Sequence, residues 1–342
     1  MRRTGVTVLG WASLVAGVLT SAVLLVLRLV PEIHTWHFYV IAVSSFMPLL
    51  WIPVLVGCLG LLLVLRARWR LLGAAVLIAM MAVFAWPLLP QQERSDTPIA
   101  VGSTLTVLSL NLQFGQADID EVSELITADV DVLALQEYTP GFEEELESAG
   151  LLEKFTHQVG TAATDASGTM LLSRTPVELV ARAEGTAFEN LIATTTVEGT
   201  DWHLGVIHTA PPQMGADAWA HDGAAVHDLV EPYLEENLLL VGDFNAIDQH
   251  RTMRELTADG DLHDLAARRQ GEGLGWHPTW PTGRWVPPFA RIDHALAADG
   301  VRGGVSLFVT VTGSDHKALL IEVDAGRSSP TGTLLTGGPD HG

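Results

Sequence analysis

The stretch Val241-Gly242-Asp243-Phe244-Asn245 decides how this chain is interpreted. The apolar run at residues 238–241 predicts a short buried strand, which breaks at Gly242 and then presents two polar side chains. Because side chains alternate along an extended chain, Asp243 and Asn245 point to one side and Phe244 to the other. A carboxylate and a carboxamide at a strand end suit metal-assisted chemistry on an oxyanion. The plain alternative is a strand that ends in an aspartate capping a turn.

Apolar runs elsewhere in the chain end in the same way. In each of them a polar side chain suited to metal binding or proton transfer stands at a predicted strand end: Asn111, Glu137, His208, Asp293 with His294, and Asp315 with His316. Taken alone, Asn111 could be a turn residue, Glu137 a surface carboxylate and His208 a core histidine. One shared cleft is a simpler account than so many independent coincidences. The sequence therefore predicts an active site at these strand ends.

The first 90 residues are strongly apolar and predict a membrane domain of three transmembrane helices. Apolar stretches cover residues 5–30, 38–65 and 71–90. Each can cross a hydrocarbon core about 30 Å thick, which takes about 20 residues. The second stretch is overlong and contains Pro48 and Pro53, so we expect it to be kinked or tilted. A signal peptide is not expected, because the first stretch is too long for one and further membrane segments follow it.

Basic residues set the expected orientation of these spans. Arg2 and Arg3 precede the first span and three more arginines stand at residues 66–70, whereas Arg28 alone lies near the opposite side. Positive-inside bias therefore places the N-terminus in the cytoplasm. Three crossings then put everything after residue 90 outside a bacterial cytoplasmic membrane. The lone Cys58 falls within a span, so we expect no disulfide in the outer domain.

Charge separates the two halves of the chain. Residues 1–94 carry seven arginines against Glu32 and Glu93, and because the whole chain carries −21, the remainder carries −26. A domain of this charge repels polyanions, which disfavours DNA or RNA as its partner. A solvated, salt-adapted surface would explain the acidity equally well. The expected partners are a phosphorylated small molecule or lipid, and the lipid bilayer.

Residues 104–324 predict one α+β domain, which follows a linker at residues 91–103. Strand-like runs occupy residues 104–112, 132–136, 168–174, 190–198, 202–209, 238–243, 291–297, 305–311 and 318–323, and helical patterns occupy residues 119–126, 141–149, 216–236 and 251–269, with Asp118 as the expected cap of the first helix. Many strands with few helices between them favour two packed sheets flanked by helices. Residues 325–342 are rich in Gly, Ser, Thr and Pro, so we expect a disordered tail.

The order of these segments resembles the endonuclease/exonuclease/phosphatase superfamily, the metal-dependent phosphoesterases related to DNase I. The resemblance covers residues 104–324 and rests on Leu-Ser-Leu-Asn111, Leu-Gln-Glu137, Gly168-Thr-Met-Leu-Leu-Ser173-Arg174, His208, Gly-Asp243-Phe-Asn245, Arg291-Ile-Asp293-His294 and Ser314-Asp315-His316. It implies a four-layered α/β sandwich, with two packed mixed β-sheets between helices. The spans before this domain are similar to those of actinobacterial membrane hydrolases linked to teicoplanin resistance. That similarity implies a lipid-linked phosphate or diphosphate of the cell-wall cycle as the substrate.

The resemblance also implies a divalent metal ion, Mg²⁺ or alternatively Mn²⁺. Such ions prefer hard oxygen ligands, and the expected ligands are Asn111, Glu137 and Asp315. A calcium loop starting at Asp243 is disfavoured, because Asp248 stands where that loop needs a glycine. Zinc is not expected, because the outer domain has no cysteine and no His-Glu-x-x-His helix.

The remaining site residues are expected to handle protons and the phosphate. His316, oriented by Asp293, would serve as general base or as an acid that contacts the phosphate. By resemblance Asp243 orients or deprotonates the attacking water, while Asn245 and His208 donate to phosphate oxygens. The proton acceptor stays open between Asp243 and His316.

Two other functions stay open from the sequence. An extracellular metal-dependent nuclease would need a basic groove, which two lysines and few arginines scarcely provide. A non-catalytic membrane protein that binds a phosphorylated ligand would be favoured by a missing site residue, yet every family position that can be placed is filled. The segment Trp276-His-Pro-Thr-Trp280-Pro either lines a substrate groove or packs inside the domain.

Overall fold

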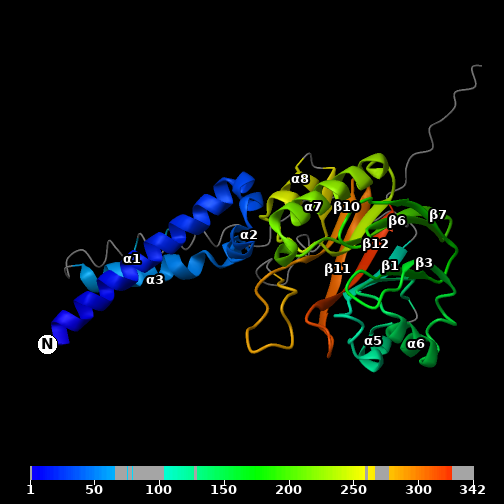
Figure 1. Ribbon diagram of the computed structural model, residues 1–342, viewed down its shortest axis with the longest axis horizontal. Helices are drawn as coiled ribbons and strands as arrows, with labels where there is room; N and C mark the ends of the chain where they lie inside the picture. The colour runs from blue at the N-terminus through cyan, green and yellow to red at the C-terminus, as the bar shows by residue number, and fades with distance from the viewer. Residues whose placement is uncertain are drawn as a thin grey trace, which may run out of the picture.

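The protein combines an N-terminal helical hairpin with an α+β domain built on two sheets (Figure 1). The computed structural model describes residues 2–65, Ala75, Ala79 and residues 104–126, 129–258, 261–265 and 277–325. The expected third span at 71–90 (except Ala75 and Ala79), the linker at 91–103 and the tail beyond Ala325 lie outside the described residues. The predicted fold class is confirmed, because two mixed sheets pack together with helices outside them.

Both sheets have six strands in the part of the chain that the structure describes. The first has the order β11-β12-β1-β2-β4-β3, formed by β1 (Thr104–Asn111), β2 (Val132–Gln136), β3 (His157–Thr161), β4 (Thr169–Ser173), β11 (Val301–Thr310) and β12 (Lys317–Ala325). The second has the order β5-β6-β7-β8-β10-β9, formed by β5 (Val177–Arg182), β6 (Leu191–Val197), β7 (Thr200–His208), β8 (Leu238–Asp243), β9 (Leu262–Asp264) and β10 (Asp293–Ala298). The β1–β2 and β7–β8 pairs are parallel and the other described pairs are antiparallel.

The main core lies between the two sheets. Val107 and Val132 of the first sheet and Trp202 and Val241 of the second belong to one buried cluster there. Complete burial of a valine side chain, as in this cluster, contributes roughly 1.5–3 kcal/mol to the free energy of unfolding. Helices α5 (Ile119–Leu125) and α6 (Pro140–Ser148) cover the outer face of the first sheet, and α7 (Ala216–Val230) and α8 (Arg251–Leu256) cover that of the second. The result is a sandwich of four layers.

A local sequence signal explains where α5 begins, whereas the region after Arg251 departs from the predicted helix. The side chain of Asp118 accepts hydrogen bonds from the backbone N–H groups of Asp120 and Glu121 at 3.0 and 3.1 Å, so the expected cap of α5 is confirmed. The expected helix at 251–269 is wrong, because α8 ends at Leu256 and Leu262–Asp264 forms β9 instead. Pairing with β10 satisfies the backbone of this short segment, and such tertiary contacts override local helical preference.

Helices α1 (Arg2–Leu29) and α3 (Trp51–Val64) form the hairpin that extends from the domain. Two segments, Gly5–Leu29 and Met47–Val64, are long and apolar enough to cross a membrane, with 17% and 28% of their most apolar windows buried. Such exposed apolar helices are unlike the core helices of a water-soluble domain. The two helices pack closely where glycines meet, since a Cβ at Gly17 would strike the backbone of Gly57.

The second predicted span, at residues 38–65, was expected to be kinked or tilted, and the structure shows a full break in it at the turn of the hairpin. The chain there forms η1 (Pro31–Trp36), α2 (Phe38–Ser44) and η2 (Met47–Leu49) before α3 begins. Pro48 lacks a backbone N–H and its ring blocks the preceding turn, which explains the break. Pro53 is tolerated because it stands in the first turn of α3. The turn also packs on the domain, where Ile41 joins the cluster between the second sheet and α7.

Candidate active site

Strand ends from both sheets meet at one edge of the domain. We call it the catalytic edge, after the catalytic role that the sequence predicts for it. Parallel pairing places Asn111 beside Gln136, directly before Glu137, and places His208 beside Asp243. Asp293 at the start of β10 lies opposite Asp243. The β1 and β8 ends are joined directly, because Asn111 Nδ2 donates to Asp243 Oδ2 at 3.1 Å.

Asp243 lies at the centre of this edge. Its side chain is buried, Oδ1 accepts the Asn245 N–H at 2.8 Å, and Oδ2 lies 3.7 Å from His316 Nε2 and 3.8 Å from His208 Nε2. Burial raises the pKa of Asp243 to about 7, although the positive charge of His316 works against the rise. Gly242 lets the backbone before Asp243 pass close to β7, because a Cβ at residue 242 would strike the Ile207 carbonyl.

Glu137 and Asn111 lie at the ends of β2 and β1, two neighbouring strands of the first sheet. Asn111 Nδ2 donates to Glu137 Oε1 at 3.3 Å, and the Phe114 N–H donates to Glu137 Oε2 at 2.7 Å. Burial raises the pKa of Glu137 despite these two bonds. Glu137 has φ 55°, a left-handed conformation that costs a non-glycine residue of order 1 kcal/mol or more. The hydrogen bonds hold the carboxylate in this strained position, facing the catalytic edge.

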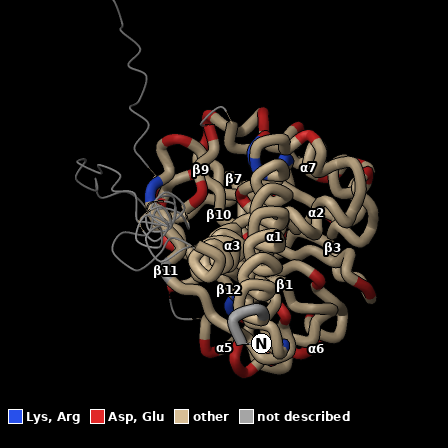
Figure 2. The backbone as a smooth tube through the Cα atoms, turned by 90° about the vertical axis from the view of Figure 1, so that its left-hand side faces the viewer, with Lys and Arg blue, Asp and Glu red and all other residues tan. Residues whose placement is uncertain are grey.

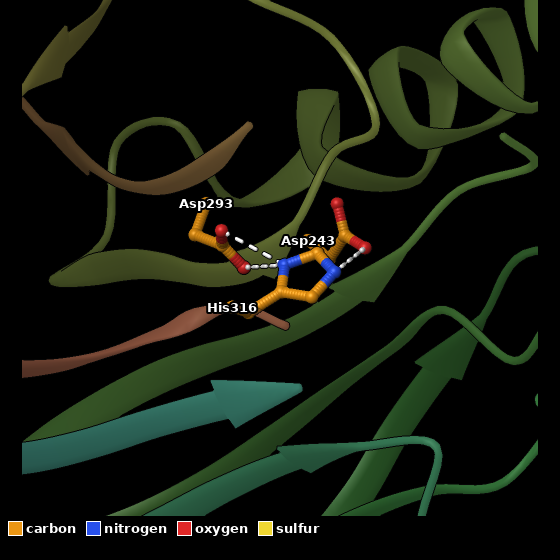
Figure 3. Close-up of side chains that lie close together, drawn as sticks. All are labelled: Asp243, Asp293 and His316. Atoms are coloured by element: carbon orange, nitrogen blue, oxygen red, sulfur yellow. Dashed lines mark hydrogen bonds and ion pairs between the residues drawn. The ribbon is translucent and has the colours of Figure 1, made fainter. Parts of the chain in front are cut away.

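Asp293 and His316 form a buried pair (Figure 3). His316 Nδ1 lies 3.0 Å from both carboxylate oxygens of Asp293, while Nε2 on the other side of the ring faces Asp243. Burial opposes a charged imidazole, but the carboxylates of Asp293 and Asp243 outweigh it and raise the pKa of His316 to about 10. Ser314 fixes the loop before β12, since its Oγ donates to the Asn111 carbonyl at 2.6 Å and accepts the His316 N–H.

His208 and Asn245 lie beside Asp243 with part of their hydrogen-bonding capacity already used. The amide nitrogen of Asn245 donates to the Thr209 carbonyl at 2.9 Å and to Asp243 Oδ2 at 3.2 Å. The ring of His208 stacks on Phe188 with centroids 4.2 Å apart, and burial lowers its pKa to about 3, so it is neutral. Its Nδ1 has no hydrogen-bond partner among the described residues. In this arrangement Asn245 positions Asp243.

Asp315 lies at the rim of the site, where its neighbours are Trp280 and Arg284. Trp280 Nε1 donates to Asp315 Oδ2 at 3.3 Å, and Arg284 Nη2 lies 3.5 Å from the same oxygen. Trp280 also packs with Phe289, as the packing alternative for the Trp-rich segment expects, while a role in a substrate groove stays a prediction. Trp276 lies outside the described residues. Arg284 carried no sequence signal, because it stands in an irregular loop.

The donor set fits a hard divalent cation. Four carboxylates, those of Glu137, Asp243, Asp293 and Asp315, gather around one imidazole, and Asp243, Asp293 and His316 can place their ligand atoms within 4.8 Å of one another. Burial raises the pKa values of Glu137 and Asp243, and a cation there would favour the ionised form of both carboxylates. Asn111 turns its amide nitrogen toward two of these carboxylates, while its Oδ1 accepts the Gln113 N–H at 2.9 Å.

A second acidic group on the other face of β10 does not fit a metal ion. Asp248, Asp264 and His294 lie close together, but the buried guanidinium of Arg291 already lies between the two carboxylates, 2.5 Å from Asp248 Oδ1 and 2.9 Å from Asp264 Oδ2. His294 Nδ1 completes the network at 3.1 Å from Asp264 Oδ2. This cluster is a structural ion-pair network.

Comparisons with known proteins identify the family and support the fold. The profile of the Endonuclease/Exonuclease/phosphatase family matches residues 108–316, and the chain belongs to this family. A family protein from Bacteroides thetaiotaomicron has 15% identity and a TM-score of 0.51, covering 66% of this chain and 98% of its own. A family protein from Beutenbergia cavernae has 20% identity and a TM-score of 0.51, covering 66% and 72%. Humanized D. rerio TDP2 has 16% identity and a TM-score of 0.50, covering 65% and 99%. A search of curated proteins by sequence gives no match.

Proposed function

We propose that the protein is a membrane-anchored phosphoesterase that depends on Mg²⁺ or Mn²⁺ and hydrolyses a lipid-linked phosphate or diphosphate outside the cell membrane. Residues 1–90 would form its membrane domain and residues 104–324 its catalytic domain. The observation that carries the proposal is the row of Asp293, His316 and Asp243, to which both sheets contribute, with Glu137 on the same edge. Polar groups prearranged around a reacting phosphate are what hydrolysis of a phosphoester requires.

We assign each site residue a role in the reaction from the family resemblance and from its contacts. Glu137 and Asp315, with Asn111 beside them, would hold the metal ion, which supplies positive charge to a phosphoryl oxygen when bound. Asp293 fixes the ring of His316 through Nδ1, so that Nε2 faces Asp243 across 3.7 Å. The proton of the attacking water passes to one of these two groups, and Asn245 keeps Asp243 in place.

The hairpin supports the proposed orientation. The turn at residues 30–50 contacts the domain, whereas α1 runs away from the domain toward the N-terminus (Figure 1). A bilayer around the two spans would therefore separate the N-terminus from the catalytic edge. Arg2 and Arg3 on the N-terminal side agree with a cytoplasmic N-terminus. The acidic domain supports a lipid headgroup as the substrate in preference to a polynucleotide.

A hydrolysis panel tests the proposal. The full-length protein in lipid nanodiscs would be given a prenyl diphosphate, sphingomyelin, a phosphoinositide, bis(p-nitrophenyl) phosphate and DNA, each with Mg²⁺, with Mn²⁺ and with EDTA. We expect metal-dependent release of phosphate or headgroup from a lipid substrate and little action on DNA. If the protein hydrolyses none of these substrates with either metal, the result counts against the proposed hydrolase function. If it prefers DNA, the proposed substrate class changes from a lipid to a nucleic acid.

A matched pair of variants assigns the metal-dependent step. Glu137→Gln keeps the size of the side chain but removes its charge, so we expect a loss of roughly 10²–10³ in turnover. Glu145→Gln makes the same change on the exposed face of α6 and should leave turnover unchanged. Equal turnover in the two variants would remove Glu137 from the site.

A further inference from the structure

A short loop next to the catalytic edge carries the most exposed tryptophan of the described residues. The chain leaves the Trp280–Ala290 bridge and returns to it, and we call residues 281–289 the Trp285 loop. Its base is fixed, because the Thr282 N–H donates to the Asp315 carbonyl at 2.7 Å and Thr282 Oγ1 donates to the Ser314 carbonyl at 2.9 Å. At its tip Trp285 is 95% exposed.

The base of this loop is joined to the membrane hairpin. Phe289 stacks on Phe46 of the turn, with ring centroids 4.8 Å apart and planes within 5°. Trp280 and Phe289 also pack on a buried cluster to which the ends of both spans contribute, through Leu27 and Leu50 among others. The loop therefore leaves the domain at the level where the first span ends, at Leu29, and the second begins.

The surroundings of the loop suit the surface of a bilayer. Figure 1 shows the segment, in orange, on the side of the domain from which the hairpin extends. Seen from that side in Figure 2, the acidic residues lie mainly around the outline of the domain, and the area around α1 and α3 carries few of them. The turn adds two more exposed aromatic residues, Trp36 at 75% and Tyr39 at 65%. Tryptophan and tyrosine concentrate at headgroup level, because their rings are apolar and their N–H and O–H groups reach water.

We propose that the Trp285 loop rests on the outer leaflet of the bilayer that holds the spans, with Trp285 at headgroup level, so that the catalytic edge takes phosphates carried by lipids of that leaflet. The loop connects this surface to the site, since Trp280 and Arg284 both contact Asp315. Arg284 is 56% exposed in its side chain and supplies a cation for an incoming headgroup phosphate. The part that concerns the substrate rests on the proposed hydrolase function, whereas the position of the loop does not.

A fluorescence measurement tests the position without using activity. In full-length protein with Cys58→Ala, a single cysteine would be introduced by Trp285→Cys or, as the control, by Val180→Cys on β5, where the side chain is 42% exposed. Both are labelled with an NBD fluorophore and placed in nanodiscs of phosphatidylcholine and phosphatidylglycerol. We expect a blue-shifted emission at position 285, with quenching by headgroup spin-labelled lipid and protection from iodide. Equal iodide access at both positions would overturn the proposal, and would also be the result if the tip served a protein partner.

A second measurement tests delivery of the substrate. Trp285→Ser should raise the apparent KM for a lipid phosphate in nanodiscs by about tenfold, as expected for the loss of one buried aromatic contact. Its kcat and its rate on a water-soluble phosphodiester should match those of Val180→Ser. An unchanged KM on lipid would overturn the delivery role. If the unaltered protein hydrolyses no phosphoester, the proposed function fails, while the fluorescence result still decides the position of the loop.

Discussion

The pair of Asp293 and His316 provides the sharpest test of the site. Asp293→Asn preserves the shape of the side chain but removes its charge, and both of its oxygens now lie 3.0 Å from His316 Nδ1. Coulomb's law at this separation, with an effective dielectric constant of ~20, gives about 5 kcal/mol. The desolvation of two buried groups offsets part of this energy. An asparagine can also donate to Nδ1, which would favour the wrong tautomer of the ring.

We therefore expect turnover to fall by roughly 10²–10³, because each 1.4 kcal/mol of lost transition-state stabilisation is about tenfold in rate. The assay is steady-state hydrolysis by the full-length protein in nanodiscs, with Mg²⁺ and the best substrate of the panel described above. Circular dichroism and thermal unfolding would show that the variant is folded. A variant that keeps more than about a third of its turnover would refute the idea that Asp293 orients a functional His316.

The chain contains a matched control for this experiment. Asp264 lies 3.1 Å from His294 Nδ1, so Asp264→Asn makes the same change in a second Asp–His pair away from the catalytic edge. The folded fraction of this variant should keep its turnover, although its stability should fall because Arg291 loses a partner. If Asp264→Asn lost as much turnover as Asp293→Asn, the effect would come from general damage to β10.

Two further predictions concern the hairpin and its contact with the domain. Burial lowers the pKa of His250 to about 3, so from pH about 6.5 downward the unfolded chain binds a proton that the folded chain does not. The free energy of unfolding should therefore fall by up to about 1.4 kcal/mol for each pH unit. In thermal-unfolding scans His250→Gln should make this fall less steep, and the part that remains would come from His208, whose pKa burial also lowers. The same slope in the variant would contradict this. Gly17→Leu forces a side chain into the backbone of Gly57, so the apparent Tm in nanodiscs should drop, whereas Val18→Leu on the exposed side of α1 should leave it unchanged.

The strands that carry the site could be predicted because they are buried on both faces. The sequence predicts strands at residues 132–136 and 238–243, where apolar runs end in a polar residue. Strands β2 and β8 have these bounds in the structure. The edge strands β3 and β5 escaped prediction, because one face of each is exposed and their sequences are mixed. The site residues lie together as expected, while the roles assigned to them stay predictions.

The contact between hairpin and domain could not be predicted from local sequence. Ser44 Oγ lies 2.7 Å from His250 Nε2 although the two residues are 206 positions apart, and the Arg251 N–H donates to His34 Nδ1. Ser44 belongs to the second predicted span, whereas His34 lies between the first two predicted spans and His250 precedes the helix predicted at 251–269. Only the folded domain supplies their partners, and these lie against the turn in which α2 ends at Ser44.

The segment Arg291-Ile-Asp293-His294 shows how strand geometry separates function from stability. Asp293 and His294 are adjacent, and because side chains alternate along a strand, one faces the catalytic edge and the other faces away. Arg291 and His294 hold Asp264 on the side of β10 away from His316, so this network stabilises the strand. Asp293 stands at the start of β10, opposite Asp243 of β8. Thr279 reinforces this position, since its Oγ1 accepts the N–H groups of both Ile292 and Asp293 at 3.2 Å.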